Sequence, residues 1–421
     1  MEPAKQTPRD PLGWCIALAF AFWALMLVRL TIPSTPYFDE IHYLPAAREY
    51  WGLGKFLNRE HPLLGKELIA LGMQLFGDKP LGWRIFPTAG GALALFAAMR
   101  ALWFASQSRF ATLAYGVLLA TGFYIFANAR IAMLDIFMVG FVALAYWQLA
   151  AAVRAAERGR RHLVLAGVAL GLALASKWNA APLALLPGLA FLVLRLGAGR
   201  RNFLLSRRGA PVPGVSLLEA GVWLGVLPLA VYALTYLPAW SFAEGAIGTA
   251  SGSADVLALH TDAIRLQESV VKTHPYMSRW PQWVLNARSI WYLYEPIDGA
   301  QRGIVLIGNP LTMLLGLPAL LWAASEAIIR RKGAAAAVAV LYAVTLGFWI
   351  ASAKPVQFLY HYFLPSMALL AALALALDAL WQQGRRWMAL APLAGSVALF
   401  GYFYPILSAA PLAGGKMAFT E

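Results

Sequence analysis

The chain has 421 residues, of which 60% are hydrophobic and only 13% are charged. A soluble domain of this length cannot hide so much apolar surface, so the composition predicts a polytopic membrane protein. The net charge of +14 does not indicate nucleic acid as a partner, because the basic residues cluster between apolar segments, as topology signals do. The single cysteine, Cys15, excludes a disulfide framework and a cysteine-ligated metal site.

Apolar runs of the length needed to cross a bilayer core predict eleven membrane-spanning helices in an all-α protein. They lie at about 13–31, 82–104, 109–127, 131–151, 163–177, 180–196, 216–238, 303–329, 334–351, 356–379 and 387–408. The first run is as long as a spanning helix, and we therefore interpret it as a retained helix and not as a cleaved signal peptide.

Alternate connections between these runs are short and rich in arginine, which is typical of cytoplasmic loops. The basic residues in this set are Lys5, Arg9, Arg109, Arg154, Arg158, Arg160, Arg161, Arg200, Arg201, Arg207, Arg208, Arg330, Arg331, Lys332, Arg385 and Arg386. This pattern predicts a cytoplasmic N-terminus and, with an odd number of spans, a C-terminus on the outer side.

The same topology places two long loops, 32–81 and 239–302, on the outer face. They divide the chain into an N-terminal module of residues 1–238, which includes the first loop, the second loop itself, and a C-terminal four-helix module of residues 303–421. Within the first loop, segments 39–53 and 61–76 have apolar faces at helical spacing, so we expect two helices lying along the membrane interface.

Paired carboxylates stand a few residues after the first predicted span. Asp39 and Glu40 would repel each other near a low-dielectric boundary, which raises at least one pKa and suits a general base. The structural alternative is that Asp39 only caps the following helix. His42 and Tyr43 come next and are candidates for contacts with an acceptor or a sugar.

A second polar motif opens the later interfacial segment. His61 and Lys66 lie five residues apart around Pro62, and a helix N-terminus with a nearby lysine favours a bound anion such as phosphate. The alternative is that Pro62 merely starts the helix and that Lys66 extends toward lipid headgroups.

Charged residues at the ends of spans form a third group. Arg84 lies near the outer end of the second span, and Arg130 and Asp135 lie at the outer start of the fourth. Charges at this depth indicate function, but an interhelical structural pair is the competing interpretation. Lys177, in the turn Ser176-Lys177-Trp178-Asn179, is a further candidate for binding phosphate.

The second outer loop and two later turns supply the remaining candidates. They are His274, Tyr276, Arg279 and Trp280, then Asn309 in Gly308-Asn309-Pro310 and His361 in Tyr360-His361-Tyr362. Such aromatic and hydrogen-bonding groups suit a sugar or a peptide, with an interfacial aromatic belt as the alternative. No pair of histidines has helical ligand spacing, so we predict no metal site and no cofactor.

Together these motifs resemble the protein O-mannosyltransferase family, membrane glycosyltransferases of the GT-C class that use polyprenyl-phosphate sugars. The matching pieces are Phe38-Asp39-Glu40-Ile41-His42-Tyr43, His61-Pro62-Leu63-Leu64-Gly65-Lys66, Arg84, 130–135, 176–178, 308–310 and 360–362. Leu63 replaces a proline that the family usually has. The second outer loop, about 64 residues, is too short for the β-trefoil domain of the eukaryotic members, so the chain resembles a compact bacterial member.

The resemblance implies a GT-C fold and a role for each motif. Asp39 is then the catalytic base, assisted by Glu40. The donor phosphate would be bound by residues from Arg84, Lys66, His61, Lys177 and Arg130. The sugar or the acceptor would be contacted by residues from His42, Tyr43, Asp135, His274, Tyr276, Arg279, Trp280, Asn309 and His361.

The sequence therefore predicts an inverting glycosyltransferase at the outer face of the bacterial inner membrane. It would transfer mannose from a polyprenyl-phosphate-mannose donor to Ser or Thr of an exported polypeptide. Two alternatives stay open: a lipid or glycan acceptor, as in the enzymes that add aminoarabinose to lipid A, and a secondary transporter that uses Asp39 and Glu40 as proton sites.

Overall fold

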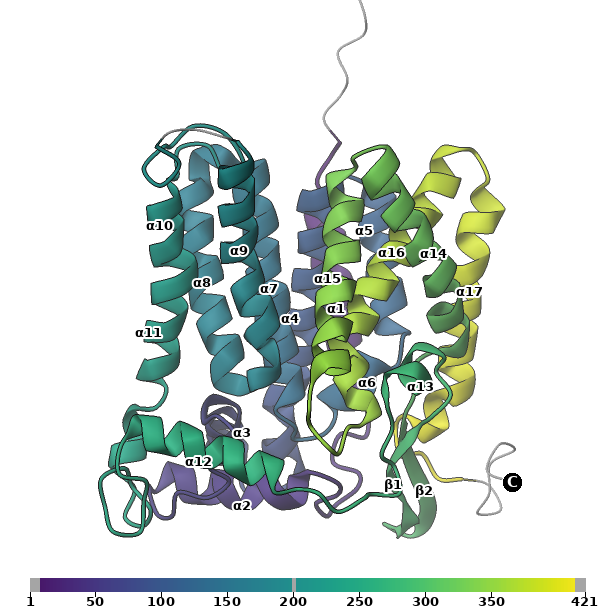
Figure 1. Ribbon diagram of the computed structural model, residues 1–421. Coiled ribbons are helices and arrows are strands. Elements are labelled where there is room, and N and C mark those ends of the chain that lie inside the picture. The colour runs from purple at the N-terminus through teal and green to yellow at the C-terminus, as the bar shows by residue number, and fades with distance from the viewer. Residues whose placement is uncertain (1–7, 199–201, 413–421) are drawn as a thin grey trace, which may run out of the picture.

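A computed structural model describes residues 8–198 and 202–412. Lys5, Arg200 and Arg201 of the predicted cytoplasmic set lie outside these residues. The long helices are α1 (Leu12–Leu27), α4 (Pro80–Ser106), α5 (Arg109–Ala120), α7 (Asp135–Arg154), α8 (Gly159–Ser176), α9 (Ala181–Gly197), α10 (Leu217–Gly221) continued by α11 (Leu227–Leu234), α14 (Pro310–Ile329), α15 (Gly333–Ala351), α16 (Phe363–Gln382) and α17 (Arg386–Phe403). They stand side by side as a bundle (Figure 1).

A helix lies in each of the eleven predicted ranges, and eight helical segments of the described residues are long and apolar enough to cross a membrane. Helices α1 and α5 are apolar but shorter. The predicted span 109–127 is interrupted, because α5 ends at Ala120 and α6 (Tyr124–Ala129) follows a break. The protein is membrane-embedded and crosses the bilayer several times.

A second layer covers one end of the bundle, which is the lower end in Figure 1 and is called the lower end below. It contains α2 (Glu40–Trp51) and α3 (Leu64–Phe76), as predicted for the first long loop. It also contains α12 (Val256–Glu268) and α13 (Trp280–Val284) from the second long loop. Residues 202–216 before α10, and the connections between α14 and α15 and between α16 and α17, lie at the opposite end (Figure 1).

A β-hairpin at the lower end is a small addition to the predicted helical fold. Strands β1 (Ile290–Ile297) and β2 (Ala300–Leu306) pair antiparallel around Asp298 and Gly299, both of which have positive φ. An Asp-Gly pair favours this two-residue turn, so the signal was present in the sequence. The predicted span 303–329 is wrong at its start, because residues up to Leu306 belong to β2 and the helix begins at Pro310.

Glycines let α4 and α7 pack closely at the centre of the bundle. A Cβ added to Gly140 of α7 would lie 3.0 Å from the backbone oxygen of Gly90 of α4, and one added to Gly91 would lie 2.6 Å from the Cβ of Ala129, at the end of α6 just before α7. Small residues at such crossings allow backbones in a membrane to approach each other. The close packing fixes the start of α7, and therefore the position of Asp135, relative to α4.

Candidate active site

Asp39 lies at the N-terminal end of α2, at the lower end of the bundle. The residue before it, Phe38, has φ +48°, which is unusual for a bulky side chain and is found where the surrounding structure fixes the backbone. The ring of Phe38 is stacked on that of Tyr292 of β1, with centroids 4.2 Å apart. The hairpin of the second long loop thus helps to hold the segment that carries Asp39.

The carboxylate of Asp39 sits in a recess. The residue is partly exposed, yet surrounding protein is close enough that burial raises its pKa to about 6, with Asp135 acting in the same direction and Lys177 opposing. Within the described residues its side chain accepts no hydrogen bond. It is therefore an accessible carboxylate with a pKa near that of a working general base.

Glu40, the next residue, is fully buried. Its two carboxylate oxygens accept from Nε and Nη2 of Arg84, both at 2.8 Å, and both side chains are 0% exposed. The backbone N–H groups of Tyr37 and Ala132 also donate to Glu40, at 3.3 and 2.9 Å. Burial, together with Asp135, raises the pKa of Asp39; the predicted repulsion by Glu40 is not its cause.

All the nitrogen atoms of the Arg84 guanidinium donate hydrogen bonds to oxygen atoms of the protein. Besides Glu40, it donates to the carbonyl oxygens of Leu30, Pro33 and Thr35, at 3.1, 2.7 and 3.2 Å. These contacts tie the chain between α1 and α2 to α4, and they leave no N–H for a ligand. A direct contact between Arg84 and a donor phosphate would require some of them to break.

Two other predicted phosphate ligands also bind backbone carbonyls. Lys66 is 0% exposed, and its Nζ donates to the carbonyls of Asn58 and His61 at 2.5 and 2.9 Å, while burial lowers its pKa to about 7. Arg130 donates to the carbonyls of Met26, Val28 and Arg29 at the end of α1. Both side chains hold the loops around the site.

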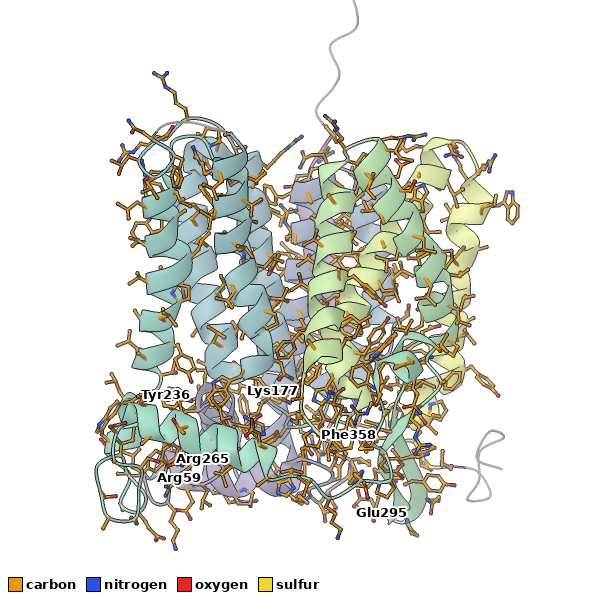
Figure 2. All side chains as sticks on the ribbon, in the orientation of Figure 1. Arg59, Lys177, Tyr236, Arg265, Glu295 and Phe358 are labelled. Carbon is orange, nitrogen blue, oxygen red and sulfur yellow. The ribbon has the colours of Figure 1, made fainter. Side chains whose placement is uncertain are left out.

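Lys177 and Asp135 form an ion pair close to Asp39. The Nζ of Lys177 lies 2.7 Å from Oδ2 of Asp135, and it lies 5.2 Å from the ring centre of Tyr360. Figure 2 places Lys177 where the bundle meets the layer that contains α12. Both members of the pair act electrostatically on Asp39, as does His42, so the structure brings these four predicted residues together.

The turn that carries Lys177 is held by α12 of the second long loop. The indole N–H of Trp178 donates to the hydroxyl of Tyr232 at 2.9 Å, and that hydroxyl lies 2.7 Å from Nε2 of His260. The side chain of Gln267 donates to the carbonyl of Glu60 at 2.7 Å. The second loop therefore contacts both sides of the site.

His61 and Tyr43 lie next to this group. Their rings meet edge to face with centroids 5.8 Å apart. Burial lowers the pKa of His61 well below its usual value, and Lys177, Lys66 and Lys354 act in the same direction. His61 is thus neutral at pH 7 and offers hydrogen bonds without a charge.

The remaining predicted residues lie elsewhere or serve packing. Asn309 is 0% exposed and donates to the carbonyls of Thr121 and Ser396. His361 stacks on Trp349 with centroids 3.8 Å apart. His274, Tyr276 and Arg279 belong to the segment before α13 and Trp280 is its first residue; His274, Arg279 and Trp280 are exposed.

One residue near the site was missed by the sequence analysis. Lys354, in the connection between α15 and α16, acts electrostatically on Asp39 and is influenced in turn by Asp39, Asp135 and Lys177. Phe358 of the same connection is visible at the lower end in Figure 2. No group of three or more metal-binding side chains occurs within residues 8–198 and 202–412.

An apolar groove of about 150 Å³ runs between the helices on the bundle side of this group. It is lined by Val139 of α7, Leu183 of α9, Leu364 of α16 and residues of α4, α5 and α15. Val139 and Leu364 come four residues after Asp135 and Tyr360, which is about one helical turn. The polar group thus lies about one helical turn from the nearest lining residues of an apolar groove.

Residues 16–242 match the family of dolichyl-phosphate-mannose-protein mannosyltransferases. A polyprenol-phosphate-mannose--protein mannosyltransferase of Mycobacterium tuberculosis is 30% identical over 96% of the chain and 90% of its own length. The chain belongs to this family. Another protein of the same name, from Corynebacterium glutamicum, is 28% identical over 90% of the chain and 85% of its own length.

The fold agrees with membership of the dolichyl-phosphate-mannose-protein mannosyltransferases. The Pmt1-Pmt2 complex of S. cerevisiae, bound to its sugar donor, has a chain that matches with a TM-score of 0.80 and 14% identity, covering 96% of this chain and 91% of that one. ArnT from Cupriavidus metallidurans, bound to undecaprenyl phosphate, matches at 0.58 and 16% identity, covering 91% and 64%. The protein is therefore a membrane glycosyltransferase with the predicted GT-C fold.

Proposed function

We propose that this enzyme transfers mannose, with inversion, from a polyprenyl-phosphate-mannose donor to a Ser or Thr hydroxyl of an exported polypeptide. The observation that carries the proposal is the accessible carboxylate of Asp39, which has no hydrogen-bond partner among the described residues, close to the lower end of an apolar groove. The groove suits a polyprenyl chain, and the polar group next to it suits the phosphate and the sugar. The names of the relatives from Mycobacterium and Corynebacterium support the donor and the acceptor class.

The reaction is a single displacement at the anomeric carbon. The acceptor oxygen forms a bond to C1 of mannose while the bond from C1 to the phosphate oxygen breaks, and that oxygen keeps the electron pair. The acceptor proton passes to the carboxylate of Asp39, which acts as general base. One displacement inverts the anomeric configuration, by analogy with single-displacement glycosidases.

The other residues have supporting roles in this scheme. Lys177 is a ligand for the donor phosphate, and Asp135 orients its ammonium through their ion pair. His42, Tyr43 and His61 are contacts for the sugar or the acceptor. Glu40 and Arg84 position Asp39 by fixing the chain on either side of it. The second long loop excludes water, which would otherwise hydrolyse the donor.

The arginine-rich connections support an orientation with this site outside the bacterial inner membrane and the N-terminus in the cytoplasm. An acceptor delivered in extended form across the membrane would then meet Asp39 at the lower end. Membership of a glycosyltransferase family removes the reason to consider a secondary transporter.

The test uses purified enzyme in lipid with radiolabelled polyprenyl-phosphate-mannose and a mixture of exported polypeptides. Label on protein that is released by β-elimination and lost in Asp39→Asn would support the proposal. Label that appears only in a lipid or glycan fraction would keep the site and change the acceptor. No transfer with any acceptor or sugar would contradict the proposed reaction.

A further inference from the structure

Lys354 differs from the other cations around the site. Arg84, Arg130 and Lys66 donate to backbone or carboxylate oxygens, and Lys177 is paired with Asp135. Lys354 is only half-buried, and in the described part of the chain no hydrogen bond or ion pair reaches its ammonium group. A partly enclosed cation without a paired counter-charge is stable only when water or a ligand forms hydrogen bonds with it.

The backbone at Lys354 is held in place even though its side chain is not. The side-chain amide of Gln357 donates to the carbonyls of Lys354, Ser352 and Trp349, at 3.3, 3.4 and 3.4 Å. The carbonyl of Gln357 in turn accepts from the N–H of Ser278 at 2.9 Å. Gln357 is itself buried, so the turn that carries the lysine is anchored to the protein.

The charges that face Lys354 come from three other segments. They are Lys177 after α8, Asp135 at the start of α7 and Asp39 before α2. His61 and His361 are also within its electrostatic reach, and both are influenced by its charge. Burial and the charge of Lys177 lower the pKa of Lys354 to about 8, while the two carboxylates act in the opposite direction. An anion between the two ammonium groups would relieve their repulsion.

The apolar groove leads to the same place. Thr345 of α15 lines the groove nine residues before Lys354, and Leu364 of α16 lines it ten residues after. The connection that carries Lys354 therefore joins two helices that form one wall of the groove. A lipid whose chain occupied the groove would present its phosphate between Lys354 and Lys177.

We propose that Lys354 binds the phosphate of the lipid donor together with Lys177 and stabilises the charge that this phosphate gains when the sugar leaves. The identity of the lipid rests on the function proposed above, whereas the binding of a phosphate group by the two lysines does not. Charge-assisted contacts of this kind favour the departing phosphate over the intact diester, because they strengthen as negative charge develops.

Binding is measured first, without any transfer reaction. Farnesyl phosphate is titrated into the full-length protein in nanodiscs, with farnesol as the uncharged probe. We expect Lys354→Gln to weaken farnesyl phosphate binding about 10- to 100-fold, the usual range for a lost hydrogen bond to a charged group, and to leave farnesol binding unchanged. Lys354→Arg should bind nearly as well as wild type. Wild-type affinity of Lys354→Gln for farnesyl phosphate would overturn the proposal.

Lys55→Gln is the matched control, because Lys55 is an exposed lysine at the same end of the protein and is paired with Glu244. It should bind both probes as wild type does. An equal loss in Lys55→Gln and Lys354→Gln would mean that general surface charge attracts the lipid, and would also overturn the proposal. Because no residue of the described ranges pairs with the ammonium group of Lys354, replacing it leaves no buried group of these residues unpaired.

The pH profile gives a second readout that a merely structural lysine would not change. The free enzyme needs a protonated Lys354, so wild-type kcat/KM should fall above about pH 8. Arginine stays charged, so Lys354→Arg should lose this alkaline fall while keeping the acid limb. An unchanged alkaline limb in Lys354→Arg would contradict the role of Lys354.

The two proposals fail in different ways. If wild-type enzyme binds farnesyl phosphate through Lys354 but transfers no mannose, the phosphate site stands and the proposed reaction is wrong. If mannose transfer occurs at equal rates and equal KM in wild type and Lys354→Gln, the reaction stands and the inference about Lys354 is wrong.

Discussion

Two neighbouring carboxylates, Asp39 and Glu40, meet opposite surroundings. Glu40 is 0% exposed, and among the described residues its carboxylate accepts hydrogen bonds from Arg84 and from backbone N–H groups. Asp39 faces a recess and its carboxylate has no hydrogen-bond partner in the described residues. The difference shows that a carboxylate is available for a reaction only where the fold does not already occupy its hydrogen-bond acceptors. Glu40 fixes the backbone, and this fixed backbone positions the carboxylate of Asp39.

Asp39→Asn is the change with the largest expected effect on activity. The amide cannot accept the acceptor proton, and a lost general base costs about 10²- to 10⁴-fold in turnover. Thermal unfolding should change little, because no hydrogen bond to this side chain is broken. Mannose transfer and melting temperature are measured on the same preparation, and near-normal turnover would remove Asp39 from the reaction.

Glu40→Gln should have the reverse profile. It leaves the buried guanidinium of Arg84 without its counter-charge, and breaking such a pair costs about 3–5 kcal/mol of stability. We expect a lower melting temperature and less folded protein in detergent, as measured by size-exclusion chromatography and thermal denaturation. A Glu40→Gln protein that is as stable as wild type but inactive would give Glu40 the direct role that the sequence suggested.

Acid should inactivate the enzyme through Asp39 before it unfolds the protein. Burial raises the pKa of Asp39 to about 6, so the reactive carboxylate is lost as the pH falls through that value. At pH 5, kcat/KM should be about tenfold below its plateau. An acid limb whose midpoint lies near 4 would mean that Asp39 is more solvated than its recess indicates.

Tyr292→Leu should have the smallest effect on turnover and tests the support of Phe38. The stacked pair contributes about 1 kcal/mol, and the hydroxyl of Tyr292 also donates to Oδ1 of Asn128 at 3.0 Å. We therefore expect a few-fold lower turnover with a loss of stability of about 2 to 4 kcal/mol. Tyr294→Leu is the matched control, because Tyr294 is an exposed aromatic residue of the same strand. If both variants behaved alike, the contact with Phe38 would not be what matters.

The helices, and Asp39 as a candidate base, could be predicted from the sequence for physical reasons. Long apolar runs allow few alternatives to spanning helices, and Asp39 is adjacent in sequence to the motif that marks it. The ion-pair partner of Glu40 could not be predicted, because Arg84 is 44 residues away. Nothing in the local sequence indicates which charged side chains will pair in the fold. The same limit applies to Lys66, whose partners are carbonyl groups that carry no sequence signal.

Lys354 was missed for a related reason. It stands in Ser352-Ala353-Lys354-Pro355, a short turn without a motif, and only folding brings it near Lys177 and Asp39. The hairpin is a different case, because Asp298 and Gly299 signalled its turn. The apolar residues of β2 lead into the apolar run of α14, so hydropathy alone does not separate the strand from the helix.

The unpaired ammonium of Lys354 also bears on what happens after transfer. The donor phosphate is a diester with one negative charge, whereas the spent carrier is a monoester whose second ionisation has a pKa of about 6. Two nearby lysines would therefore hold the spent lipid more tightly than the fresh one at neutral pH. We expect product inhibition by polyprenyl phosphate, so that turnover in the membrane depends on how quickly the used carrier is withdrawn and recharged.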